Sequence, residues 1–219
     1  MGTCAPFFAV LIVAAAPLGA MAQTATPPAA VERPEAAPSA EAAPPAAAGP
    51  EAAKSAEPDR AKRLDALFAA LKAAPDSESA KAIAARIDVA LTPSGSDTAD
   101  LLMARASQAT QAKEFDLAVD LLDGLLRIEP DYLEAWNKRA TVFFLRQDFS
   151  NALTDLRQVV AREPRHYGAW AGIAIICKEI GDEKRALEAA RHALALYPHL
   201  DEIEDMEEEL SIKVEGRPI

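Results

Sequence analysis

The side chains that could take part in chemistry are few and lie far apart in the sequence. His166, His192 and His199 do not follow the spacing of zinc ligands, and there is no HExxH or CxxC motif. We expect His192 on the exposed side of a helix, and His166 and His199 at the surface in turns between helices. Cys177 has no visible base, so we interpret it as a small packed thiol. We therefore expect no metal site and no cofactor.

Two pairs of acids are the remaining candidates for acid–base chemistry, Asp120/Asp123 and Glu207/Glu208. Both pairs fall on predicted solvated helix faces, without an apolar pocket to raise a carboxyl pKa. The nine glycines form no phosphate-binding loop, and the segment PSGSD is typical of a turn. We therefore expect that the protein is not an enzyme.

The composition indicates which elements carry these side chains. Only 5% of the 219 residues are aromatic and alanine is very common, which favours closely packed helices over sheets. The formal net charge of −11 argues against nucleic-acid binding, because phosphate contacts need clustered Lys and Arg. Residues 201–219 alone hold eight acids and two bases.

Residues 1–22 have the layout of a secretory signal peptide. An apolar run from Pro6 to about Ala16 is followed by Ala20-Met21-Ala22, a small-residue pattern at the expected cleavage point. No Lys or Arg precedes the run, which departs from the usual pattern. The alternative is an uncleaved anchor, but Pro17 and Gly19 leave fewer than the roughly 20 apolar residues of a spanning helix. We expect a periplasmic or secreted protein without stable membrane insertion after cleavage.

Residues 23–58 form a predicted disordered linker. This segment holds eight of the 16 prolines and almost no large apolar residue, so it buries too little surface to fold. It is either a passive spacer or a segment with a docking role. Residues 59–96 come next as a predicted helical hairpin, with Leu64, Leu67, Phe68 and Leu71 on one helical face. We interpret this hairpin as an N-terminal cap over the repeat region at residues 97–200.

Four columns of residues recur in that region at a spacing of 34. One column is Pro130, Pro164 and Pro198, which end helices because proline lacks a donor and disfavours helix before it. The others are Leu102/Trp136/Trp170, Ala106/Ala140/Ala174 and Ala118/Ala152/Ala186. The large residue fills the space between hairpins, and the small residues allow helices to approach closely. Overpacking such a crossing costs about 1–3 kcal/mol.

A 34-residue unit of two helices with these columns resembles the tetratricopeptide repeat (TPR). The resemblance covers residues 99–132, 133–166 and 167–200. It implies an all-α fold, a short α-solenoid of TPR helical hairpins. One departure concerns the position before the small residue of the first helix, where leucine is usual. Arg105 and Arg139 occupy it here, and the arginine stem can still cover apolar surface.

The resemblance also implies a concave groove that binds a protein or peptide. Nine positions face it by analogy: Met103, Ser107, Thr110, Asn137, Thr141, Phe144, Ala171, Ile175 and Lys178. Some members clamp a chaperone's C-terminal carboxylate with Lys, Arg and Asn. That clamp is absent, because Met103, Ser107, Thr141, Ala171 and Ile175 stand at its positions.

Residues 201–219 continue as a predicted acidic capping helix and tail, with Leu200, Ile203, Met206 and Leu210 on one face. Terminal repeats need such a polar outer surface for solubility. Two functions remain open. One is a periplasmic adaptor or scaffold with an unknown protein partner. The other is a self-associating structural envelope protein, since three repeats are near the lower limit for a stable stack.

Overall fold

The structure is a computed structural model, and it describes residues 50–92 and 94–216. For residues 50–59 it describes the backbone alone. The predicted signal peptide (residues 1–22) and the predicted linker up to residue 49 lie outside the described residues, so both stay predictions. All the helices below belong to one compact unit of the chain.

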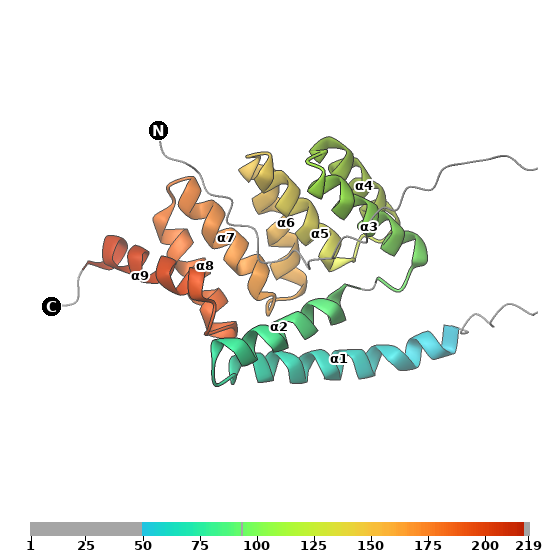
Figure 1. The fold of residues 1–219 in the computed structure, drawn as a ribbon, viewed down its shortest axis with the longest axis horizontal. Helices are drawn as coiled ribbons and strands as arrows, with labels where there is room; N and C mark the ends of the chain where they lie inside the picture. Colours follow the sequence, from blue (N-terminus) through green and yellow to red (C-terminus); the bar gives the residue numbers. More distant parts are fainter. Residues whose placement is uncertain (1–49, 93, 217–219) are drawn as a thin grey trace, which may run out of the picture. The chain divides into compact units, whose positions relative to one another are not determined.

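The described residues fold into nine helices without a strand, which confirms the predicted all-α class. The helices are α1 (Pro50–Lys72), α2 (Ser77–Leu91), α3 (Asp97–Gln111), α4 (Phe115–Ile128), α5 (Leu133–Leu145), α6 (Phe149–Arg162), α7 (Tyr167–Glu179), α8 (Glu183–Leu196) and α9 (Asp201–Glu215). Three consecutive pairs, α3/α4, α5/α6 and α7/α8, pack as hairpins in chain order (Figure 1). Apart from the first two residues of α3, each pair lies inside one predicted 34-residue unit.

Helix α1 begins at Pro50, earlier than the predicted hairpin start at residue 59. The prolines of this stretch were one reason to predict that the disordered linker extends to residue 58. The run EAAKSAE after Pro50 is rich in strong helix formers, however, and proline is tolerated at the first position of a helix. The linker prediction is therefore wrong for residues 50–58.

The columns predicted from the 34-residue period pack as expected. Ala118, Ala152 and Ala186 are fully buried, as expected for positions where helices approach closely. The second column of small residues, Ala106/Ala140/Ala174, is also buried. The large residues Leu102, Trp136 and Trp170 are partly buried against the core clusters. Helices α4, α6 and α8 each end two residues before the column proline.

The turn inside each hairpin places one residue in the left-handed conformation. Lys113 has φ 61°, Gln147 φ 62° and Gly181 φ 79°, again 34 residues apart. Each turn closes with a backbone bond from the following residue to the last turn of the first helix, as from Asp148 N to Phe143 O at 2.9 Å. This is the Schellman arrangement, in which glycine is favoured because it has no Cβ.

Gln147→Gly is expected to raise the free energy of unfolding by about 0.5–1 kcal/mol, because relief of the left-handed strain exceeds the added entropy of the unfolded chain. Urea unfolding followed by circular dichroism measures the change. Gly181→Ala is the matched control and should lower the same quantity. A destabilised Gln147→Gly variant would contradict this account of the turns.

Helices α1 and α2 form the predicted hairpin, and its buried side chains mark where it packs. Leu67, Phe68 and Leu71 of α1 and Ile87 of α2 cluster with Tyr197, at the end of α8. Tyr167 and Leu200 complete this cluster, whereas no residue of α3 belongs to it. The hairpin thus lies along the turns that lead from one repeat into the next (Figure 1). It is not one more layer stacked on the first repeat.

Helix α9 covers the other end of the array. Ile203 and Leu210 are buried against α7 and α8, and Met206 packs beside them. Its charged residues pair with α8, as in Arg191 Nε to Glu207 Oε1 at 2.8 Å. Helix α9 thus occupies the place predicted for the capping helix. It closes the apolar end of the third repeat and leaves an acidic face toward solvent.

Candidate functional site

The predicted groove residues lie on the first helix of each hairpin, α3, α5 and α7. Within each helix they follow the spacing i, i+4, i+7, which places them on one face. Eight of the nine are partly exposed, neither buried nor fully in solvent: Ser107, Thr110, Asn137, Thr141, Phe144, Ala171, Ile175 and Lys178. Met103 is 8% exposed and packs in the core cluster of the first repeat, so it supports the surface from below. No bound molecule tests the groove, which stays a prediction.

Three polar members of this set, Thr110, Asn137 and Thr141, are already bonded within their own helices. Thr110 Oγ1 donates to Ala106 O at 2.7 Å, and Thr141 Oγ1 donates to Asn137 O at 3.0 Å. Asn137 Nδ2 donates to Glu134 Oε2 at 3.3 Å. The hydroxyl oxygens keep their acceptor capacity, and Asn137 keeps its carbonyl and a second N–H. This surface can therefore bond both donors and acceptors of a peptide backbone.

The surface becomes apolar toward its C-terminal end. Phe144 lies beside Phe149, with ring centroids 5.8 Å apart. Ala171 and Ile175 of α7 pack at the edge of the core cluster formed with α8 and α9. Lys178 Nζ meets Glu209 Oε2 of α9 at 2.6 Å, so α9 borders the predicted groove at this end. Lys178 thus forms an intramolecular salt bridge, and it is also one of the predicted contact residues of the groove.

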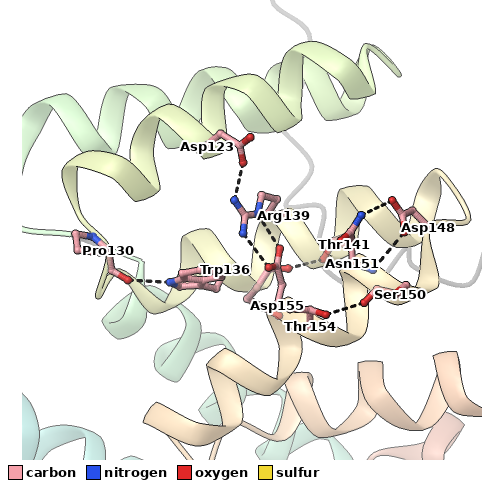
Figure 2. Close-up of polar contacts among 11 residues, drawn as sticks. Asp123, Pro130, Trp136, Arg139, Thr141, Asp148, Ser150, Asn151, Thr154 and Asp155 are labelled. Carbon is pink, nitrogen blue, oxygen red and sulfur yellow. Dashed lines mark hydrogen bonds and ion pairs between the residues drawn. The ribbon is translucent and has the colours of Figure 1, made fainter.

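Arg139 joins α5 to both neighbouring second helices, and Figure 2 shows this network. Its Nε and Nη2 donate to Asp155 of α6 at 2.8 Å each, and its Nη1 reaches Asp123 of α4 at 2.5 Å. The guanidinium also lies 4.8 Å from the ring centroid of Trp136. The sequence predicted only that the arginine stem covers apolar surface, and these ion pairs were missed. The sequence did contain a signal for these ion pairs, because Asp123 and Asp155 each lie 16 residues from Arg139.

Asp155 is a carboxylate in an apolar setting, with its side chain only 4% exposed. Burial raises the pKa of Asp155, while the hydrogen bonds and charge of Arg139 act in the opposite direction. The same contacts raise the pKa of Arg139. The bidentate geometry keeps both groups charged at neutral pH and ties α5 to α6 within the second hairpin, whereas the bond to Asp123 ties this hairpin to the first. The network of Arg139, Asp155 and Asp123 lies behind the groove face and therefore supports that face.

A second polar cluster lies where α5 and α7 begin. The ring of His166 is buried, and its Nδ1 accepts the Ala169 N–H at 3.0 Å, which caps α7. Since Nδ1 is an acceptor, Nε2 carries the hydrogen and donates to Glu134 Oε1 at 3.0 Å. The expectation that His166 lies on the surface is wrong, because α5 and the hairpin α1–α2 cover the turn that contains it. His192 is exposed as expected and stacks on Trp170, with ring centroids 4.5 Å apart.

The protonation of Glu134 links this cluster to stability. Burial alone would raise its pKa, but the hydrogen bonds from His166 and Asn137 lower the pKa of Glu134 below its ordinary value. A carboxylate with a depressed folded pKa stabilises the fold above its unfolded pKa. That stability is lost as the pH falls through the folded pKa.

The free energy of unfolding is therefore expected to decrease below a pH of about 4.5, the ordinary carboxyl value of Glu134. Glu134→Gln should flatten this part of the profile, because the amide does not titrate. Urea unfolding between pH 3 and pH 7, roughly the range in which acids titrate, provides the measurement. The exposed Glu188→Gln is the matched control. An unchanged slope in the Glu134→Gln variant would show that this cluster does not contribute.

No three His, Cys, Asp or Glu side chains among residues 60–92 and 94–216 are placed to hold a metal ion. The buried polar side-chain atoms of this part all have hydrogen-bond partners, so none points unsatisfied toward a missing ligand. None of the described helices has the length and apolar character needed to cross a bilayer. Burial raises the pKa of the Cys177 thiol, which opposes a role as a nucleophile.

Comparisons with known proteins agree with this architecture. A TPR repeat-containing protein of Rhizobium etli is 39% identical to this chain over 137 residues, which is 63% of this chain and 67% of that relative. No family model matches the chain.

Two solved structures are similar in fold. The first TPR of Spaghetti (RPAP3), bound to the HSP90 peptide SRMEEVD, has a TM-score of 0.52 at 18% identity, over 55% of this chain and 95% of that one. MamA from Desulfovibrio magneticus has a TM-score of 0.50 at 16% identity, over 72% of this chain and 87% of that one. At these identities the two structures support the arrangement of helices alone.

Proposed function

Because the chain belongs to the tetratricopeptide-repeat family, we propose that it is a protein–protein interaction scaffold that holds a peptide or protein segment on the predicted groove of α3, α5 and α7. The observation that carries the proposal is the exposure of this surface. Eight predicted contact residues on three neighbouring helices are partly exposed together, with small, hydroxyl, amide and apolar groups side by side. One solved structure of similar fold contains a bound peptide, which supports this use of the surface.

The chemistry of the surface bears on the class of partner. Arginine and lysine that would clamp a terminal carboxylate are absent from the positions of Ser107, Thr141 and Ile175. The one lysine of the set, Lys178, is already paired with Glu209. We therefore propose a partner segment held by shape, apolar contact and backbone hydrogen bonds, and not by its acidic end.

Site-specific photo-crosslinking tests the proposal. A crosslinking amino acid at Thr141 or Ile175 should capture a discrete partner from a cell-envelope extract, and mass spectrometry should map the contact to one segment. The same amino acid at the exposed Thr154 of α6 or at Asp120 of α4 is the matched control. Equal capture from both sets of sites, or none from either, would remove the groove as the binding surface.

We further propose that the protein acts in the bacterial periplasm or is secreted, on the basis of the predicted signal peptide. N-terminal sequencing of the protein from its native host should then begin at Gln23. A mature chain that keeps Met1 would overturn export by cleavage and would favour the anchor.

Self-association is a second candidate function, supported by one observation. Leu101 of α3 is 55% exposed, whereas Ala135 and Ala169, one and two repeats later, are fully buried by the preceding hairpin. The stacking face of the first repeat is thus open, although Gln108 makes it more polar than Val142 and Ile176 at the equivalent place. Light scattering at micromolar concentration should show a dimer that Leu101→Glu dissociates. A monomer under these conditions would exclude this candidate.

A further inference from the structure

The hairpin α1–α2 contacts all three turns that lead into a new first helix. These turns precede α5, α7 and α9, and we refer to them together as the junction edge. In a repeat array each unit ordinarily contacts only its neighbours, so curvature results from the rotation between adjacent units. An element that contacts three successive junctions adds a restraint that nearest-neighbour packing does not provide.

Helix α2 meets the junction edge at three points along its length. At its C-terminal end, Thr92 O accepts the hydroxyl of Tyr132, before α5. One turn earlier, Asp88 Oδ1 accepts the hydroxyl of Tyr167, at the start of α7, at 3.1 Å. Two turns earlier again, Lys81 Nζ lies 3.3 Å from Asp201 at the start of α9. The contacts thus run in reverse order along α2 and reach all three junctions.

The length of α2 matches this arrangement. Its 15 residues span about 22 Å at about 1.5 Å per residue. Its contact positions Lys81 and Thr92 lie about 16 Å apart along the helix at about 1.5 Å per residue. One straight helix can therefore reach the first and the last junction at once, and a bent or stretched array would break one of the end contacts.

Helix α1 holds α2 in this place. Asp65 Oδ1 pairs with Arg165 Nη1 at 2.6 Å, and the Arg165 guanidinium lies 4.7 Å from the ring centroid of Phe68. Behind them, Leu71 is fully buried in the cluster that includes Tyr197. His199 Nε2 lies 2.9 Å from Ala74 O in the turn between α1 and α2. The hairpin is thus fastened by an apolar core and by polar contacts from both of its helices.

We propose that the hairpin α1–α2 is a brace that sets the curvature of the three repeats, and hence the spacing of α3, α5 and α7. When the brace is released, the repeats remain folded but their relative orientation varies. The inference goes beyond the proposed function, because it concerns the free protein and requires no partner.

Distances between spin labels on the full chain test the brace. Asp120 of α4 and Glu188 of α8 occupy equivalent positions two repeats apart, so Asp120→Cys/Glu188→Cys reports the curvature. Cys4→Ser removes one native thiol, and Cys177 is buried; a chain without the added cysteines verifies that it does not label. The braced protein should show one narrow distance by double electron–electron resonance.

Leu71→Asp places a charge in the buried contact and should detach the hairpin without a change in any repeat residue. The expected result is the loss of the single narrow distance, with fast amide exchange in α1 and α2 and slow exchange in α4 to α8. Ala70→Asp adds the same charge at the exposed neighbouring position and should keep the narrow distance. Phe68→Ala is a milder release variant for use if Leu71→Asp unfolds the chain.

Two results would overturn the brace. One is a detached hairpin, shown by fast exchange in α1 and α2, together with an unchanged label distance. The other is joint unfolding of hairpin and repeats in both release variants, which would make them one cooperative unit instead of a brace on a separate array.

Discussion

Arg139→Met is expected to lower the free energy of unfolding by about 3–5 kcal/mol, because it leaves the buried carboxylate of Asp155 without its partner. Asp155 accepts two hydrogen bonds from the guanidinium of Arg139, both at 2.8 Å, and the side chains of Arg139 and Asp155 are 16% and 4% exposed. The thioether of methionine can replace the stem but not the charge. Urea unfolding at neutral pH, followed by circular dichroism, gives the difference.

The double variant Arg139→Met/Asp155→Leu is the control for this prediction. Replacing a whole buried ion pair with apolar side chains is often neutral, so most of the lost stability should return. The deficit of the single variant should also shrink as the pH falls. Burial raises the pKa of Asp155, and without Arg139 nothing opposes that effect, so the neutral acid forms more readily in the folded state. If the double variant lost as much free energy of unfolding as Arg139→Met alone, the unpaired charge of Asp155 would not be the cause of the loss.

Trp136→Ala is expected to cost about 3–5 kcal/mol of stability, the usual effect of removing a large aromatic side chain from a packed site. The indole packs against the core cluster of the first repeat and also against that of the second and third. Its Nε1 donates to Pro130 O at 2.8 Å, and Arg139 and Arg162 lie over the ring. Its loss therefore opens the interface between two repeats.

Trp136→Phe separates the packing from the hydrogen bond, since phenylalanine keeps an aromatic ring but cannot donate to Pro130 O. Its loss should be clearly smaller than that of Trp136→Ala. Far-ultraviolet circular dichroism is the suitable probe, because the variants change the tryptophan fluorescence itself. If Trp136→Ala cost less than about 1 kcal/mol, the column would be a surface feature and not an inter-repeat contact.

The candidate site was only partly predictable. Its helices and the shared face of Ser107, Asn137 and Ile175 can be derived from the period, because residues four and seven apart lie on one side of a helix. The burial of Met103 could not be derived from the period, since it depends on the side chains that pack beneath that face. The pairing of Glu134 with His166 joins residues 32 positions apart at the starts of two helices, and local patterns carry no information on such contacts.

Two levels of organisation separate clearly in this protein. The helices, the 34-residue unit and the buried columns can be read from the sequence, because each depends on local propensity and on short repeated offsets around Ala118, Ala152 and Ala186. The packing of the hairpin α1–α2 along the junction edge and the bridge from Arg139 to Asp123 and Asp155 become visible only in the folded chain. The physical reason is that these contacts join distant residues through the curvature of the whole array, which no single unit specifies.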